Sequence, residues 1–375
     1  MIYFHIPFCK QACHYCDFHF STSLKYKEDL LQAMLREIDM RASYLEEKTV
    51  ESIYFGGGTP SILEAKEIDQ LIGQIAKHFD ISSNAEITLE ANPDDLDKKK
   101  VQELRTTPIN RFSIGIQSFY EEDLRWMNRA HNSEEALSSI MRVQDAGFEN
   151  ITCDLIYGYP LLSDSKWKFN MQQLIDLQVP HISSYSMTVE KKTALDHMIN
   201  KGKTPALNEE QSAEQMLMLI DTLTGAGYEH YEISNFAKPG QHARHNSNYW
   251  MGKSYLGIGP SAHSFNGTSR SWNIANNARY INGIQTKELP LETENLSLND
   301  RFNEYVMTTL RTKWGINQQY VKNEFGADYL NSMLRNIEIY VDNNEVNISE
   351  EGIITLNPSG KLIADQIASE LFIVE

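Results

Sequence analysis

Short apolar runs alternate with amphipathic segments along the first 230 residues of the chain. Runs rich in β-branched and aromatic residues are typical of buried strands, and six of them lie at residues 2–6, 50–55, 85–90, 111–116, 150–158 and 181–187. Apolar side chains at helical spacing separate these runs, as in residues 25–40, where Leu30, Met34 and Ile38 share one face. The same spacing predicts further helices over roughly 64–79, 97–106, 134–147, 165–178 and 208–226.

Six successive strand–helix units predict an α/β architecture built on a parallel sheet. A partial (β/α) barrel and a doubly wound sheet both fit this pattern of elements. In either architecture, ligand-binding side chains gather where the parallel strands end. Chemistry is therefore expected at the carboxyl ends of the six strands.

The pattern changes after about residue 290. Helices are predicted over 300–312, 318–326 and 329–337, followed by two short strands at 344–349 and 352–357 and a last helix over 359–372. This order predicts a small, mainly helical winged-helix-like domain. The segment lacks a basic face, so we expect it to pack on the barrel or shape a partner surface rather than bind DNA. The predicted domains are 1–230, a connecting segment 231–289, and 290–375.

The net charge of the chain limits the classes of partner that it is expected to bind. It has 34 basic and 51 acidic residues and a net charge of −17, which disfavours a general nucleic-acid binder or a tRNA-modifying enzyme. The sequence has neither an 18-residue apolar run nor a signal-peptide-like start, so no integral membrane segment is predicted. Three of the four cysteines are clustered, which is unlike a disulfide framework. A cytoplasmic location is expected, and a transient visit to a membrane is left open.

Polar or glycine-rich motifs follow the predicted strands one after another. A loop with Cys9, Cys13 and Cys16 follows the first strand, and GGGTP (56–60) follows the second. The third strand ends in EANP (90–93), and Gln117 and Asp154 belong to the fourth and fifth strands. This recurrence at one rim predicts a functional site there.

The three clustered thiols allow two metal sites. A structural zinc ion takes four ligands, which His14 or His19 would have to complete. A [4Fe-4S] cluster held by three thiolates would instead leave one iron open for a non-protein ligand. The fourth cysteine, Cys153, lies in a predicted buried strand and is expected only to pack there.

The CxxxCxxC spacing of these cysteines, followed by GGGTP, resembles the radical S-adenosylmethionine (SAM) superfamily. The motifs YFHIPFC, GGGTP, EANP, IGIQSF, NRAH and DLIYGYP resemble, in that order, the oxygen-independent coproporphyrinogen III oxidase family and its heme-chaperone relatives. The resemblance implies a partial (β/α)6 radical-SAM barrel, a [4Fe-4S] cluster on the three cysteines, and bound SAM. The SAM-binding residues that it implies are Tyr3, Gly57, Gly58, Thr59, Glu90, Gln117, Arg129 and Asp154.

Two sequence features separate the branches of this family. The decarboxylating members resemble CxxxCxxCxC, whereas Asp17 and Phe18 follow Cys16 here. The CDF ending and the later HNSNYW (245–250) resemble heme chaperones of the HemW type. The resemblance implies a protein that binds heme and delivers it to hemoproteins, with a reductant protein serving the cluster. The alternative function is oxidative decarboxylation of coproporphyrinogen III to protoporphyrinogen IX, so enzymatic activity is left open.

The HNSNYW segment supplies the expected heme contacts. An imidazole such as that of His245 can ligate heme iron, while Tyr249 and Trp250 can stack on a porphyrin face. His242 and His263 are alternative ligands. The best-known relatives carry Arg-Gln at the two variable positions of HNxxYW, and this chain carries Ser-Asn.

Overall fold

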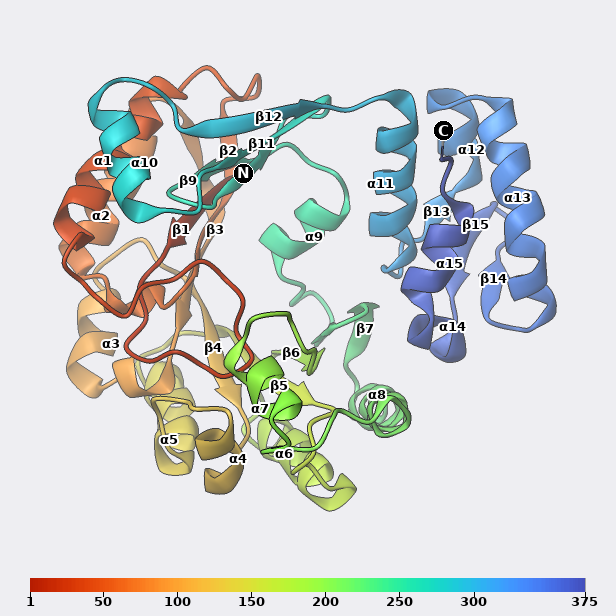
Figure 1. Cartoon of the computed structure of the whole chain (residues 1–375), viewed down its shortest axis with the longest axis horizontal. Coiled ribbons are helices and arrows are strands. Elements are labelled where there is room, and N and C mark those ends of the chain that lie inside the picture. Colours follow the sequence, from red (N-terminus) through yellow and green to blue (C-terminus); the bar gives the residue numbers. More distant parts are fainter. Residues whose placement is uncertain (375) are drawn as a thin grey trace.

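The computed structural model describes residues 1–374 and shows two parts side by side (Figure 1). The larger part is a curved sheet with helices along its outer side, and the smaller part contains the C-terminal helices. The two parts have separate hydrophobic cores, one drawn mainly from residues 2–284 and one from residues 302–371. Among the described residues, the helices are all too short or too polar to span a bilayer.

Six parallel strands form the centre of the larger part. They lie side by side in sequence order within a nine-stranded sheet ordered β7-β8-β6-β5-β4-β3-β2-β1-β9. This arrangement confirms the predicted partial barrel and all six predicted strands. Their bounds are β1 Ile2–Ile6, β2 Thr49–Gly57, β3 Asp80–Ala91, β4 Arg111–Gln117, β5 Asn150–Tyr157 and β6 His181–Ser186.

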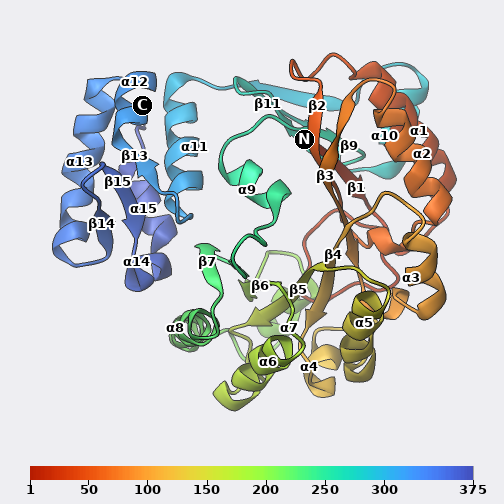
Figure 2. The ribbon, with the colours of Figure 1, turned by 180° about the vertical axis from the view of Figure 1, so that it is seen from behind.

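Several helices of the larger part begin at polar residues that cap them. Asp97, Ser163 and Asn208 each accept a hydrogen bond from a backbone N–H of the first turn, which satisfies a donor that would otherwise lack a partner. Viewed from behind, the helices follow the outer side of the curved sheet (Figure 2). The helices and 3₁₀ turns are α1 Lys27–Met40, η1 Pro60–Ile62, α2 Ala65–Ile75, η2 Pro93–Asp95, α3 Lys98–Leu104, α4 Glu121–Trp126, α5 Ser133–Asp145, α6 Asp164–Asp176, α7 Ala194–Asn200 and α8 Glu209–Gly225.

The segment that follows α8 extends both edges of the sheet. Strand β8 (Asn235–Ala237) pairs antiparallel with β6, β7 (Glu229–Glu232) pairs antiparallel with β8, and β9 (Leu256–Ile258) pairs parallel with β1. Between them, α9 (Arg244–Trp250) crosses beside the sheet (Figure 1).

A second, three-stranded sheet packs on the β1 side, with elements β10 His263–Phe265, β11 Ser269–Asn273, α10 Asn277–Gln285 and β12 Leu291–Asn295. The fully buried carboxylate of Glu37 in α1 holds this layer. It accepts hydrogen bonds from the Tyr280 hydroxyl at 2.5 Å, the Asn273 amide at 2.7 Å and the Gly259 backbone N–H at 2.9 Å. A buried carboxylate is stable only when it is paired in this way.

The C-terminal part has the predicted winged-helix-like order of elements. It comprises α11 Leu298–Leu310, β13 Ile316–Asn317, α12 Gln318–Glu324, α13 Ala327–Asp342, β14 Val346–Ile348, β15 Ile353–Leu356, α14 Pro358–Leu362 and α15 Ala364–Leu371. The two predicted strands pair with a third, two-residue strand, β13, which is too short to leave a periodic signal in the sequence.

Backbone contacts join the two parts at the β7 edge of the large sheet. The Ile233 N–H donates to the Arg311 carbonyl at 3.0 Å, and the Lys313 N–H donates to the Tyr231 carbonyl at 2.9 Å. The edge strand of the sheet therefore pairs with the segment that follows α11. The domain boundaries at residues 230 and 290 stay a prediction.

Candidate functional site

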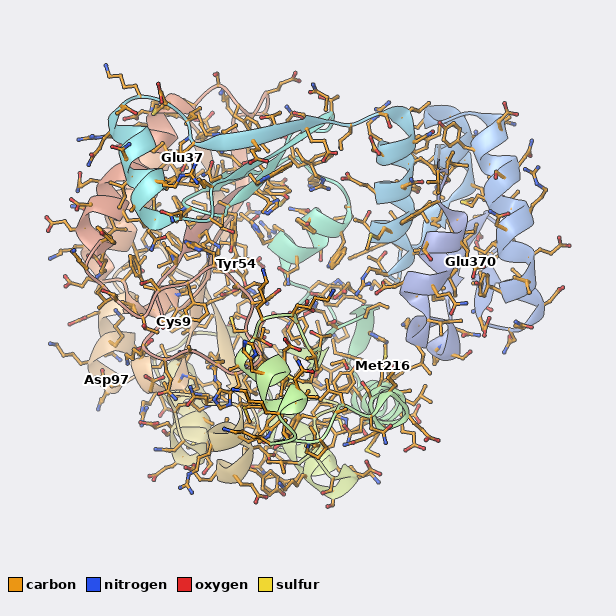
Figure 3. All side chains as sticks on the ribbon, viewed as in Figure 1. Cys9, Glu37, Tyr54, Asp97, Met216 and Glu370 are labelled. Carbon is orange, nitrogen blue, oxygen red and sulfur yellow. The ribbon has the colours of Figure 1, made fainter. Side chains whose placement is uncertain are left out.

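A cavity of about 590 Å³ opens where β1–β6 end. Its volume is typical of a site that encloses one small molecule. Cys9, Cys13 and Cys16 from the loop after β1 line it, together with side chains from the strands. In Figure 3, Cys9 and Tyr54 lie in the sheet part of the molecule, far from Glu370 in the C-terminal part.

The cavity brings together nearly the whole predicted SAM set: Gly57, Gly58, Thr59, Glu90, Gln117, Arg129 and Asp154. Tyr3 is not among the lining residues. Its ring stacks on Tyr54, with ring centres 6.2 Å apart, and its hydroxyl shares a 3.1 Å hydrogen bond with His5 Nδ1. Tyr3 therefore supports the wall from one layer behind it.

Backbone hydrogen bonds join the glycine motif to the end of β1 and to the start of the cysteine loop. The Gly58 N–H donates to the Ile6 carbonyl at 2.9 Å, and the Thr59 N–H donates to the Phe8 carbonyl at 2.7 Å. A Cβ on Gly58 would lie 2.7 Å from both of these carbonyl oxygens, which no ordinary side chain tolerates. Gly57 has a φ of +104°, a conformation that favours glycine. The motif thus fixes the cysteine loop as well as lining the cavity.

The NRAH segment holds the other side of the cysteine loop. The Asn128 amide donates to the Ala12 carbonyl at 2.7 Å, and the Gln11 amide donates back to Asn128 Oδ1 at 2.8 Å. The His14 N–H donates to the Met127 carbonyl at 3.0 Å. The loop is therefore clamped between GGGTP and NRAH, two motifs that are far apart in the sequence.

Burial favours the neutral thiols of the cysteine loop, while neighbouring donors are placed to stabilise thiolates once a cation binds. Burial raises the pKa of the Cys9 thiol, which a hydrogen bond from Thr59 opposes, and burial raises the pKa of Cys16 to about 11. Arg129 Nη1 donates to Cys13 Sγ at 3.3 Å. Buried thiols lose their protons when bound iron supplies positive charge, and such donors then stabilise the thiolates.

The two histidines of the zinc alternative have other partners. His14 Nδ1 shares a 2.7 Å hydrogen bond with the Trp126 carbonyl, and His19 Nε2 shares one of 2.8 Å with Asn277 Oδ1. Neither histidine lines the cavity. Within residues 1–374, no three His, Cys, Asp or Glu side chains, the three cysteines included, lie close enough together to share a single metal ion, which disfavours zinc. In a [4Fe-4S] cluster each thiolate binds a different iron, so its ligands need not converge on one ion.

Two carboxylates lie on the cavity wall. Glu90 accepts from the Tyr54 hydroxyl at 2.8 Å and from the Gly57 N–H at 3.2 Å, while burial raises its pKa to about 7. Burial raises the pKa of Asp154 to about 6, against hydrogen bonds from Ser183 and Ser113. Both groups change charge near neutral pH, and a cationic ligand would favour their ionised forms.

Two lining residues carry buried polar atoms without a protein partner. Gln117 Oε1 and Arg129 Nε make no hydrogen bond, although Arg129 Nη2 donates to Asn92 Oδ1 and to the Gly115 carbonyl, both at 2.8 Å. Gln117 also has a φ of +66°, which is unusual outside glycine, and lies at the end of β4, where it lines the cavity. Buried unpartnered polar atoms are costly, so both fit a polar ligand in the cavity.

The sequence analysis missed the residues that line the cavity below the strand ends. They include Tyr54, Ser113, Thr152, Ser183 and Tyr185. Ser113 and Thr152 precede Gln117 and Asp154 on the same strands at even spacing, and alternate residues of a strand face the same side. Ser183 on β6 is the cross-strand partner of Asp154. Counting back in steps of two from Gln117 and Asp154 would have found Ser113 and Thr152.

The residues of the HNSNYW segment lie in three different environments. His245 is only 7% exposed, shares a 2.9 Å hydrogen bond through Nδ1 with Ser52, and packs its ring 5.0 Å from that of Tyr54. Burial lowers the pKa of His245 to about 3. Asn246 lines the cavity, whereas Tyr249 is 41% exposed and packs on Tyr255 outside it.

The segment forms the helix α9, which packs against β2 and β3. The Arg244 and His245 N–H groups both donate to the Glu86 carboxylate at 2.9 Å, which anchors the start of the helix to β3. At its other end, the Arg311 guanidinium lies 5.6 Å from the Trp250 ring. His245 and Tyr249 do not share one surface.

Comparisons with known proteins agree with the motifs. A family model of the radical SAM superfamily matches residues 3–173. The chain is 31% identical over 373 residues to heme chaperone HemW of Lactococcus lactis and 30% identical over 368 residues to HemW of Bacillus subtilis, each match covering 97% of both chains. HemW of Escherichia coli is 36% identical over 269 residues, 70% of this chain and 69% of that one.

Among solved structures, coproporphyrinogen III oxidase (HemN) from Escherichia coli, a radical SAM enzyme, superimposes with a TM-score of 0.85. The match covers 99% of this chain and 89% of that chain at 23% identity. At this identity the likeness establishes a common fold, including the C-terminal part.

Proposed function

This chain belongs to the HemW family of radical SAM-type heme chaperones, and from that premise we propose that it binds heme and delivers it to hemoproteins. The observation that carries the proposal is the likeness to HemW along the whole length of both chains. The superfamily implies SAM and a [4Fe-4S] cluster as cofactors. The proposed partners are an acceptor hemoprotein and a reductant protein for the cluster, and the proposed location is the cytoplasm.

Cys9, Cys13 and Cys16 would hold the cluster, because they line one cavity and have donors placed to stabilise thiolates. Glu90, Gln117, Arg129 and Asp154 would hold SAM with the glycine motif, and the unpartnered atoms of Gln117 and Arg129 support this. When bound, the cluster and SAM supply one-electron chemistry. The residues themselves would orient SAM, exclude water from it and balance its positive charge.

The alternative function, decarboxylation of coproporphyrinogen III, is less well supported. The likeness to the oxidase is a likeness of fold. At the position where the decarboxylating pattern has its fourth cysteine, this chain has Phe18, which is 65% exposed and lines the cavity. A phenyl ring cannot replace a thiol as a proton or electron donor.

Two anaerobic assays on the cluster-loaded protein test the choice. In the first, heme is titrated and followed by absorbance. In the second, the protein is incubated with SAM, a reductant and coproporphyrinogen III, and protoporphyrinogen IX is measured. We expect saturable heme binding without protoporphyrinogen. Turnover of coproporphyrinogen without heme binding would reverse the assignment.

The heme contacts predicted from the sequence, His245 and Tyr249, have their own test. Ligation through His245 Nε2 would leave the Nδ1 contact with Ser52 intact, in the way that second partners orient ligating histidines. Weaker heme binding by His245→Ala, with the exposed His197→Ala as control, would support ligation. Unchanged binding would reject His245 as the ligand and leave the chaperone function in place.

A further inference from the structure

Two exposed aromatic residues line the cavity from opposite ends of the parallel strand series. Phe18, two residues beyond Cys16 on the loop after β1, is 65% exposed. Tyr185 on β6 is 44% exposed. In the sheet order β6-β5-β4-β3-β2-β1, β1 and β6 are the first and last of the six strands, and both aromatic residues line the same cavity. Exposed rings beside a cavity mark a place where an apolar partner binds.

The lining of the cavity becomes more apolar toward the ends of β5 and β6. The side formed by β2, β3 and β4 carries Glu90, Gln117 and the glycine motif, which suit SAM. The side formed by β5 and β6 carries the polar Asp154 and Ser183 and, nearer the strand ends, Ile156, Tyr185 and Met187. Ile156 pairs with Tyr185 across the two strands, and Ile156 and Met187 are buried at 6% and 5% exposed. A ligand that approaches over the ends of β5 and β6 would meet apolar surface first.

The size of the cavity determines how far such a ligand can enter. A volume of about 590 Å³ is that of a site for one small molecule, and the SAM contacts occupy its polar side. A macrocycle as large as a porphyrin must then lie partly outside, at the mouth, where Phe18 and Tyr185 are exposed. Flat apolar rings stack favourably on aromatic side chains.

Charged residues at the mouth favour one orientation of a ligand with carboxylates. Asp17 and Glu190 line the rim and repel carboxylates. Lys191 and Lys192 follow directly, and both are exposed to solvent. Carboxylates at the edge of the macrocycle would therefore point toward these two lysines and away from the cavity.

We propose that Phe18 and Tyr185 form an aromatic slot that holds the porphyrin ring of heme at the mouth of the SAM cavity, with its propionates toward Lys191 and Lys192. This inference rests on the proposed heme-binding function and gives it a site. It also gives a role to the phenylalanine that replaces the fourth cysteine: the ring supplies a wall of the slot.

Heme titration of the cluster-loaded full chain tests the slot. Phe18→Ala and Tyr185→Ala are each expected to bind heme about tenfold more weakly than wild type, because each removes one stacking face. Tyr185→Phe keeps the ring and is expected to keep wild-type affinity. Phe169→Ala, which removes a 43% exposed ring outside the cavity, is the matched control for non-specific adsorption. Iron content and SAM affinity, measured in parallel, verify that the cavity is intact in every variant.

Wild-type affinity in both alanine variants would overturn the slot, and so would an equal loss in Phe169→Ala or in Tyr185→Phe. A loss confined to His245→Ala would also overturn it, would move the ring to α9 and would leave the chaperone function standing. If wild-type protein shows no saturable heme binding, the proposed function fails, and the slot fails with it.

Discussion

The rim of the cavity and the helix α9 both carry sequence motifs, but they relate to the fold in different ways. The rim motifs follow parallel strands whose ends converge, so GGGTP, EANP, Gln117 and Asp154 meet the cysteine loop at one cavity. HNSNYW folds into a short helix that sends His245 inward, Asn246 into the cavity and Tyr249 outward. Motifs at strand ends act as one surface, whereas a helical motif distributes its members over several surfaces.

The difference changes how each motif is interpreted. For the rim, recognising a residue type and its strand is enough to place the side chain beside its neighbours. For α9, each residue needs its own observation, because positions one apart on a helix point about 100° apart. His245, the residue with the most suitable chemistry for heme iron, has its Nδ1 bonded to Ser52 and its ring against Tyr54.

The largest expected effect concerns the cysteine loop. Cys13→Ala should abolish cluster assembly, because a [4Fe-4S] cluster with one open iron needs a thiolate on each of the other three irons. The matched control is Cys153→Ala, which removes a fully buried thiol from β5 outside the cavity. Iron and acid-labile sulfide per chain after anaerobic reconstitution give the readout. Full iron content in Cys13→Ala would contradict the assignment of the cluster to the cysteine loop.

The glycine motif should tolerate no side chain at its closest contact. Gly58→Ala would place a Cβ 2.7 Å from the Ile6 and Phe8 carbonyl oxygens and push the cysteine loop away. We expect SAM affinity to fall at least about tenfold and the free energy of unfolding to fall by about 1–3 kcal/mol. Gly73→Ala in α2, where nothing lies within 4 Å of the added Cβ, should instead be neutral or stabilising.

Equilibrium dialysis with SAM and thermal unfolding measure the two glycine variants. Equal behaviour of Gly58→Ala and Gly73→Ala would show that the GGGTP contacts do not position the loop.

Two variants within HNSNYW should differ in stability. His245→Ala removes a buried ring and leaves the Ser52 hydroxyl unpaired, so it should lower the free energy of unfolding by about 1–3 kcal/mol. Tyr249→Ala removes a ring that is 41% exposed and should cost less than about 1 kcal/mol. Thermal unfolding of both apoproteins, compared with wild type, provides the measurement. Equal losses would contradict the division of the motif into a buried and an exposed side.

The smallest expected effect is a pH dependence from Glu90. Its pKa is raised from 4.5 to about 7 by burial, so between these values the folded chain binds more protons than the unfolded chain. Stability therefore falls as pH rises through this window. Glu90→Gln removes the free-energy cost of ionising a buried carboxyl group. The variant should therefore be more stable than wild type at pH 8, by on the order of 1 kcal/mol, with little difference near pH 5. The exposed Glu288→Gln serves as control, and a pH-independent difference would contradict the shift.

Local patterns were sufficient to predict the framework of the molecule. Apolar periodicity predicted the six strands and a parallel sheet, but a partial barrel and a doubly wound sheet both fitted it. The resemblance of the motifs to the radical SAM superfamily then implied the barrel, which the strand order confirms. The strand-end motifs then placed seven of the eight predicted SAM residues in one cavity. The exception is Tyr3. Its ring stacks on Tyr54, and Tyr54 is the residue that lines the cavity.

Long-range contacts account for what the sequence did not reveal. Glu37 lies on a helix face otherwise used for the core, and its partners Gly259, Asn273 and Tyr280 are more than 200 positions away. The edge strand β9 has only three residues and pairs with β1 across a similar separation. No local period signals such pairings, because they depend on where the finished sheet leaves an open edge.

The most direct test of the central claim is transfer of heme from this protein to an acceptor. Cluster-loaded protein carrying one equivalent of heme is mixed anaerobically with an apo-hemoprotein, and the Soret spectrum is followed. We expect transfer faster than from heme bound to serum albumin, and slower loading of heme onto the Phe18→Ala and Tyr185→Ala variants. Heme that stays on the protein, or moves no faster than from albumin, would contradict the chaperone function.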